Sequence, residues 1–189
     1  MDKFLAFTLK SNGIMNMLKT DTLVLSDVRD NTIPFTPKLW KGLWDTGASK
    51  SSITQRIVDD LNLIPVGNTN ISTANGVVTV NTYFVDFGLP NGVTVKNVLV
   101  SCADLGDDID ILIGMDIIRH GDFSITNVNN KTTFSFRTPS VEEIDYVKES
   151  RNINKDHNKV ANYKQMFWMV FCRLLVYNGS YNTNGWGIY

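Results

Sequence analysis

Residues 42–49 read Gly-Leu-Trp-Asp-Thr-Gly-Ala-Ser, so that an apolar run leads directly into the carboxylate of Asp45. A buried carboxylate is costly unless it is paired or hydrogen-bonded. Asp45 is therefore either a turn residue at the end of a strand, since Asp and Gly are common in turns, or a group whose charge is used in chemistry. The remainder of the chain bears on which of these two interpretations holds.

Composition describes an ordinary globular protein of 189 residues, enough for one domain with an appendage. Hydrophobic residues make up 43% of the chain and charged residues 20%, which allows a substantial core. The net charge of -1 gives no overall attraction to nucleic acid or to an anionic membrane. We therefore expect a protein that binds neither nucleic acid nor membrane.

Few residues in this sequence are suited to binding metal. Cys102 and Cys172 lie far apart and form no disulfide framework, although a single bridge between them stays open. With two histidines and no Cys-His cluster, we expect no metal and no other cofactor.

The first residues carry an acid at position 2 and do not resemble a secretory signal. The apolar stretch 166–177 contains Arg173 and is shorter than the roughly 20 residues of a membrane-spanning helix, so we expect a cytoplasmic protein.

Strand patterns dominate the sequence up to about residue 138. Residues 77–87 alternate in polarity, the turn signal Pro-Asn-Gly follows at 90–92, and another β-rich run covers 93–100, which predicts a hairpin. Residues 30–37 contain two prolines and are expected to form a loop. Further strands are predicted at 4–9, 22–25, 39–44, 109–113 and 132–136. The fold class is therefore predicted to be all-β.

Helical patterns are few. Thr54 can cap a helix whose apolar face carries Ile57, Val58 and Leu61. A second short helix is expected at 115–120. Beyond Pro139 the composition changes, and we divide the chain into a domain at 1–147 and a C-terminal extension at 148–189. The extension is expected to contain a polar linker, a helix at 160–177 and a frayed end.

Two motifs together suggest a known family. Asp45-Thr46-Gly47 is followed, much later in the chain, by Ile-Leu-Ile-Gly at 111–114 and then a short helix. A β-rich segment with Asn-Gly at its centre, residues 72–78, lies between them. In this order and at this spacing, the motifs resemble those of the retropepsin-like aspartic proteases, the retroviral type with a single lobe. The resemblance covers residues 4–138 and implies a closed acid-protease barrel with a flap hairpin, one or two short helices and the C-terminal helical extension.

The resemblance implies a role for each residue of the motifs. Asp45 would be the catalytic acid and base. Thr46 would hydrogen-bond to the partner loop, Gly47 would let the backbone approach the substrate, and Ala48 would complete the supporting loop. Four residues would pack over this loop: Ile111, Leu112, Ile113 and Gly114. An ordinary core strand is an equally valid description of residues 111–113.

Catalysis of this type requires two carboxylates that share a proton. The chain contains one Asp-Thr-Gly, so the second Asp45 must come from a second chain, and we expect a symmetric homodimer. The flap that closes on an extended peptide or protein substrate would be formed by Thr73, Ala74, Asn75, Gly76 and Val77, with Asn75-Gly76 as the turn. A plain surface hairpin is the alternative interpretation of this segment.

The favoured function is an aspartic endopeptidase that hydrolyses peptide bonds through an activated water. Two alternatives remain open: a binding or assembly module on the same fold without proteolysis, and a self-processing peptidase with one dedicated partner. Two smaller expectations concern neighbours of the motifs. Strand alternation should point Trp44 away from Asp45 and into the core, and Asp116 is expected to stabilise the start of its short helix.

Overall fold

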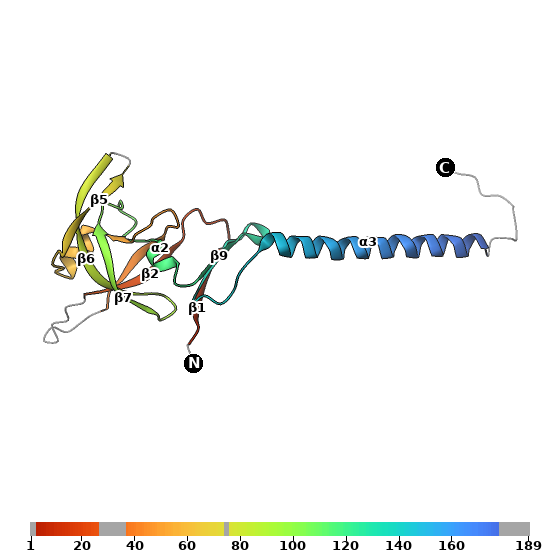
Figure 1. Cartoon of the computed structure of the whole chain (residues 1–189), viewed down its shortest axis with the longest axis horizontal. Helices are drawn as coiled ribbons and strands as arrows, with labels where there is room; N and C mark the ends of the chain where they lie inside the picture. The colour runs from red at the N-terminus through yellow and green to blue at the C-terminus, as the bar shows by residue number, and fades with distance from the viewer. Residues whose placement is uncertain (1–2, 27–36, 74–75, 178–189) are drawn as a thin grey trace. The chain divides into compact units, whose positions relative to one another are not determined.

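The computed structural model describes residues 3–26, 37–73 and 76–177, and the chain forms two compact units, Met1–Glu142 and Glu143–Tyr189 (Figure 1). The units divide slightly before the position that composition suggested. Each unit is described by itself. The predicted loop at 30–37, the centre of the predicted flap turn and the predicted frayed end fall largely or wholly outside the described residues.

The first unit consists mainly of strands, which confirms the predicted all-β class. Its strands are β1 (Leu5–Lys10), β2 (Lys19–Ser26), β3 (Leu39–Trp44), β4 (Ser52–Ile53), β5 (Gly67–Thr73), β6 (Gly76–Gly88), β7 (Thr94–Cys102), β8 (Ile111–Ile113), β9 (Asp122–Thr126) and β10 (Thr133–Thr138). Three short helical segments interrupt them: α1 (Gln55–Asp60), α2 (Met115–Ile118) and the 3-10 turn η1 (Val128–Asn130).

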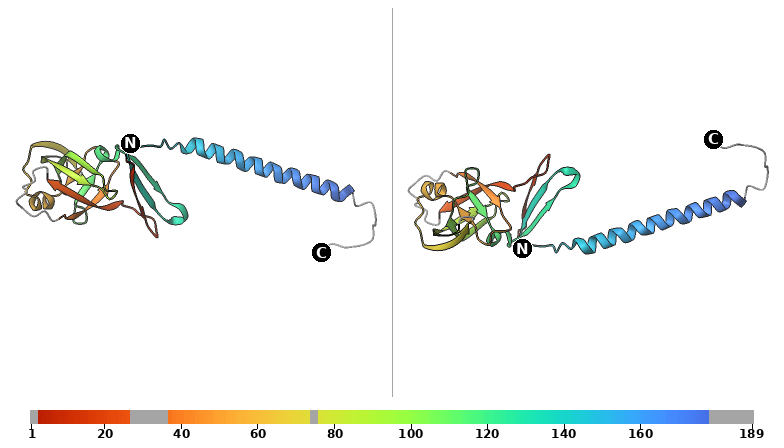
Figure 2. Two further views of the ribbon diagram at one scale, coloured as in Figure 1. Left: turned by 90° about the horizontal axis from the view of Figure 1, so that it is seen from below. Right: turned by 90° about the horizontal axis from the view of Figure 1, so that it is seen from above.

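The larger sheet closes on itself. Its strand order is β2-β3-β8-β4-β7-β6-β5, and β2 pairs with β6 as well as with β3. Six strands therefore form a ring, and β5 lies outside it, paired along β6. The second sheet has the order β1-β10-β9, and Figure 2 shows its β1 running along the hairpin of β9 and β10.

Alternation along the strands builds the core. In β6, Tyr83, Val85 and Phe87 are buried on one face, as the period of two predicts. In β3, Trp44 is only 5% exposed, and its indole N–H donates to Thr20 Oγ1 over 2.9 Å. The prediction that Trp44 points into the core is therefore confirmed.

An aromatic cluster joins the second sheet to β3. The ring centroids of Trp44 and Phe136 lie 5.0 Å apart, and Phe134 meets Trp44 edge-on at 5.4 Å. Such pairs add to the stabilisation that area burial provides. The remaining rings of the cluster belong to Phe7 and Phe123. The two sheets therefore share one core directly beside the strand that leads to Asp45.

Asp122, at the start of β9, anchors the segment after β10. Its carboxylate accepts hydrogen bonds from the Ser140 hydroxyl, from Arg137 Nη2 at 2.6 Å and from the Val141 backbone N–H at 3.0 Å. These donors, with the Ser140 hydroxyl contributing most, hold the pKa of Asp122 far below its ordinary value. Asp122 is therefore a structural carboxylate that ties residues 137–141 to the sheet.

The first helix lies where the sequence predicted it. Thr54 occupies the N-cap position of α1, and Ile57 and Val58 are buried. The Thr54 side chain makes no capping hydrogen bond, and its buried Oγ1 has no hydrogen-bond partner within the described part of the chain. Thr54 is therefore the cap residue that the sequence predicted, without a side-chain bond to the helix. The helix is held by its buried face instead.

The second unit contains one long helix, α3 (Tyr146–Tyr177). It begins well before residue 160, so the expectation of a polar linker at 148–158 is wrong. Asp145 explains the early start, because its Oδ1 accepts from the N–H groups of Val147 and Lys148 at 3.0 and 3.1 Å. This N-cap precedes a run of residues without Gly or Pro, so that nothing interrupts the helix.

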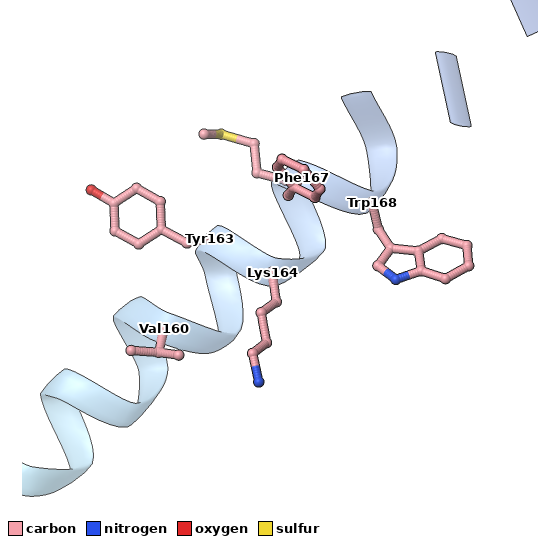
Figure 3. Close-up of a pocket in the computed structure, with 6 residues that line it drawn as sticks. Val160, Tyr163, Lys164, Phe167 and Trp168 are labelled. Atoms are coloured by element: carbon pink, nitrogen blue, oxygen red, sulfur yellow. The ribbon is translucent and has the colours of Figure 1, made fainter. Parts of the chain in front are cut away.

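Large apolar side chains project from α3. Phe167 is 72% exposed and Trp168 is 70% exposed. Figure 3 shows Tyr163, Lys164 and Trp168 leaving the helix in different directions, so the apolar groups do not form a single narrow stripe. Among the residues that the structure describes, no helix is both long and apolar enough to cross a membrane.

Candidate active site

Asp45 follows immediately after β3, where this strand runs parallel to β8. The register pairs Trp44 with Ile113, and the Asp45 N–H donates to the Ile113 carbonyl over 2.9 Å. The paired strands thus fix the backbone of the acid against the second motif. Asp45 itself is half-buried, and Thr46 and Gly47 beside it are exposed. The carboxylate therefore stands at the protein surface, on a fixed backbone.

A tight turn orients the Asp45 side chain. The Gly47 N–H donates to Asp45 Oδ1 over 2.8 Å, and the Ala48 N–H donates to the Asp45 carbonyl over 3.3 Å. A Cβ on Gly47 would lie 3.2 Å from Asp45 Oδ1, which is closer than ordinary contact. A glycine here leaves the carboxylate accessible while the backbone N–H holds one of its oxygens.

Gly114 lies against the same loop from the other side. The Met115 N–H donates to the Ala48 carbonyl over 2.8 Å. A Cβ on Gly114 would lie 2.7 Å from the Lys50 carbonyl carbon and 2.9 Å from the Ala48 oxygen. Real Cβ atoms do not approach backbone so closely, so the position requires glycine for space. The structure thus brings Asp45, Thr46, Gly47 and Ala48 together with Ile113 and Gly114; Ile111 and Leu112 pair with β3 behind them.

Sequence reasoning missed one member of this arrangement. The Asp116 carboxylate accepts from the Ser51 backbone N–H at 3.0 Å and from the Ser51 hydroxyl at 2.7 Å. The Ser51 hydroxyl oxygen in turn accepts from the Gly114 N–H at 3.0 Å. Asp116 was expected only to stabilise the start of α2. No local pattern links residues 51 and 116, because the contact depends on how the loop and the helix are packed.

The predicted flap forms a long, exposed hairpin. β5 and β6 pair from Gly67↔Thr82 to Thr73↔Gly76, and Val77 is 68% exposed. Gly76 has a positive φ of +115°. Its pairing with Thr73 makes Gly76 the first residue of a strand, not the centre of the turn. Ala74 and Asn75 lie outside the described residues.

A comparison with protein families adds a sequence-based finding to this geometry. The family model described as aspartyl protease matches residues 39–117, a segment that includes the Asp45 loop, the β5–β6 hairpin and Gly114. This segment is therefore similar to the aspartyl proteases. The match confirms the family that the two motifs predicted.

Solved protease structures were also found that resemble this chain. The EIAV protease in complex with the inhibitor HBY-793 is 20% identical, with 57% of this chain and 90% of that chain covered and a TM-score of 0.44. A retropepsin-like aspartic protease from Rickettsia conorii is 14% identical, with coverages of 73% and 98% and a TM-score of 0.44. The simian foamy virus (mac) protease is 18% identical, with coverages of 53% and 91% and a TM-score of 0.37. No curated protein matches the chain.

Proposed function

We propose that this protein is an aspartic endopeptidase whose site is completed by two chains, each contributing one Asp45. The observation that carries the proposal is the position of Asp45. Its backbone is bonded to Ile113, one carboxylate oxygen accepts from the Gly47 N–H, and the loop remains accessible from outside. A carboxylate that is fixed in place yet accessible can act on a bound water and a peptide.

The chemistry requires a pair of carboxylates. Two carboxyl groups held close together share one proton and titrate as a unit. The ionised member takes a proton from water as the water oxygen attacks the peptide carbonyl carbon. The protonated member gives its proton to the carbonyl oxygen, which yields a gem-diol. As the C–N bond breaks, the leaving nitrogen receives the proton that the other carboxylate took from water, and a diol hydroxyl returns a proton to the pair. Because the chain holds one Asp-Thr-Gly, the second carboxylate is supplied by a second copy around a two-fold axis.

The loop residues then have defined roles in the dimer. Thr46 is exposed next to Asp45, where its hydroxyl can bond to the loop of the second copy. Gly47 positions one Asp45 oxygen through its N–H. Ala48 links the loop to α2 through its carbonyl group. Residues 111–114 hold the loop from behind, and the supporting contacts come from their backbone.

The β5–β6 hairpin is proposed to cover the substrate. Val77 and Val78, on opposite faces of β6, are both exposed near the tip of the hairpin. An extended peptide can bind to such a hairpin through backbone hydrogen bonds, while pockets for alternate side chains give specificity. Closure of the hairpin would exclude water from the reacting bond. We assign the flap to Thr73, Ala74, Asn75, Gly76 and Val77, as in the sequence-based prediction.

The proposal is tested by a cleavage screen on a peptide library with the full chain. We expect wild-type protein to cleave a subset of peptides, to bind a statine-type peptide and to ignore metal chelators. Asp45→Asn keeps the shape of the side chain but cannot exchange its proton, so cleavage should fall by more than about 100-fold. Asp108→Asn, in an exposed loop, is the matched control and should cleave as wild type does.

Two outcomes would contradict the proposal. One is cleavage by Asp45→Asn at the wild-type rate. The other is a well-folded, dimeric wild-type protein that neither cleaves any peptide nor binds the statine-type peptide. The second result would favour a binding or assembly module on the same fold.

A further inference from the structure

Ser51 follows the Asp45 loop and is held by the carboxylate of Asp116, which takes no part in the proposed chemistry. Both oxygens of Asp116 accept hydrogen bonds from a single residue, Ser51, through its backbone N–H at 3.0 Å and its hydroxyl at 2.7 Å. Ser51 is fully buried. Hydrogen bonds to an ionised acceptor are among the stronger ones in proteins. We propose that Asp116 is a positioning residue that fixes the Asp45 loop for catalysis, an inference that rests on the proposed peptidase function.

The hydroxyl of Ser51 relays this contact to the second motif. It donates to Asp116 and accepts from the Gly114 N–H at 3.0 Å, so a single oxygen joins the carboxylate to the glycine. The Ser51 carbonyl also accepts from the Ser101 N–H of β7 at 3.4 Å. Ser51 is thus bonded to α2, to the residue before α2 and to the ring of strands. A displacement of Asp116 would free the connection to α2 and leave the Ser51 hydroxyl without its acceptor.

Asp116 completes a series of attachments between two short segments. The Asp45 N–H bonds to the Ile113 carbonyl, and the Met115 N–H bonds to the Ala48 carbonyl. Asp116 and Ser51 form the next attachment along both segments. The first two are backbone hydrogen bonds that any sequence of this fold would make. The Asp116 attachment depends on a side chain, so it is the one that substitution can remove without altering the strands.

The amide of asparagine cannot accept both of the hydrogen bonds that this carboxylate accepts. Asp116 accepts from two donors on Ser51, whereas an asparagine has one acceptor oxygen and an NH2 group that donates. In Asp116→Asn, the amide oxygen can accept from the Ser51 N–H and the NH2 group can donate to the Ser51 hydroxyl oxygen, but the hydroxyl hydrogen of the buried Ser51 then loses its acceptor. The shape of the side chain is kept, so the fold should persist while the loop loses one of its restraints. A misplacement of about 1 Å in a catalytic group can cost up to about 100-fold in rate.

The test measures kcat and KM separately for Asp116→Asn on a peptide that wild type cleaves. We expect kcat to fall by about tenfold or more and KM to stay within about twofold, because the substrate-contacting residues are unchanged. The matched control is Asp122→Asn. Asp122 is also a structural carboxylate with several hydrogen bonds, but its donors, which include Arg137 and Val141, lie outside the Asp45 loop. It should lower stability and leave kcat within about twofold of wild type.

Ser51→Ala provides the second arm of the test. If Asp116 acts through Ser51, the two single variants should lower kcat by similar factors, and the double variant should be no slower than either. Independent, multiplying effects would overturn the proposed route through Ser51. Equal losses of kcat in Asp116→Asn and Asp122→Asn at matched loss of stability would show that Asp116 is merely structural.

Amide hydrogen exchange separates this inference from the proposed function. Asp116→Asn should speed exchange at the Gly47, Ala48 and Gly114 amides by more than about tenfold, and Asp122→Asn should not. The measurement applies even if wild type cleaves no peptide. Unchanged exchange at these amides would overturn the positioning role. An active wild-type enzyme with unchanged kcat in Asp116→Asn would overturn it as well, and would leave the assignment of Asp45 intact.

Discussion

The Asp45 loop and the β5–β6 hairpin differ in how much freedom their surroundings leave them. The loop is bonded to Ile113, Met115 and Asp116, and Gly114 behind it has no room for a Cβ. At the hairpin, a Cβ on Gly76 would meet nothing within 4 Å. Gly114 is required because no Cβ fits there, whereas Gly76 is suited to its positive φ. The comparison indicates that this fold is rigid where a carboxylate must be placed and permissive where a peptide would be covered.

The largest effect is expected from Gly114→Ala, which would disturb the closely packed Asp45 loop. The added methyl group would press on the backbone of Ala48 and Lys50 at distances below 3.0 Å. Overpacking of this kind costs about 1–3 kcal/mol, and here the strain falls on the loop that carries Asp45. We expect kcat/KM to fall by about 100-fold or more. Peptide cleavage and urea unfolding would measure the two effects.

Gly13→Ala is the control for that substitution, because a Cβ there meets nothing within 4 Å. It should leave both cleavage and unfolding close to wild type. Full activity in Gly114→Ala would mean that the close packing behind Asp45 is not needed for its function.

Gly76→Val tests the exposed β5–β6 hairpin. Its φ of +115° resists a β-branched residue, at a cost of about 1–3 kcal/mol if the backbone cannot relax. Because the hairpin tip is exposed, local rearrangement should absorb most of this strain, so that the free energy of unfolding changes by less than about 1 kcal/mol. We expect kcat/KM to fall by about tenfold or more if the hairpin covers the substrate.

The matched variant is Gly92→Val, in the turn between β6 and β7. Gly92 also has a positive φ, +79°, and open space around it. Its stability effect should resemble that of Gly76→Val, while its activity should stay at the wild-type level. Equal activity in the two variants would remove the reason to assign the flap to this hairpin.

The smallest effect on activity is expected from Asp122→Asn, which serves as a reference outside both regions. Hydrogen bonds from Ser140, Arg137 and Val141 lower the pKa of Asp122 in the folded protein. The ionised form therefore stabilises the fold above the ordinary Asp pKa of about 4, and this stabilisation is lost as the pH falls below it. Urea unfolding should show the largest deficit of Asp122→Asn at pH 7 and a smaller one at pH 3. A deficit that does not depend on pH would contradict this account.

The sequence predicted the parts of the structure that local patterns determine. The alternation in residues 77–87 predicted the strand β6, and the alternation before Asp45 placed Trp44 in the core. The pairing of motifs at 45–47 and 111–114 predicted the aspartyl protease family. In each case the signal lies within a few residues or within a motif of fixed order.

The features that the sequence did not predict depend on packing or on a neighbouring cap. Thr54 is at the right position, but its hydroxyl makes no capping bond. The early start of α3 follows from Asp145, a cap that the polar composition of 148–158 obscured. The Ser51–Asp116 contact joins residues distant in sequence, and neither residue is unusual by itself. Only the folded chain brings them together.

Under the proposed function, one chain supplies half of a catalytic site, and a dilution series is a direct test. The specific activity of the full-length protein would be measured on one peptide, beside sedimentation at the same concentrations, in the presence and absence of excess Asp45→Asn chain. We predict that specific activity falls with the dimer fraction and that excess Asp45→Asn chain suppresses the remaining activity by forming mixed dimers. A monomer confirmed by sedimentation that cleaves at the full rate would contradict the two-chain site.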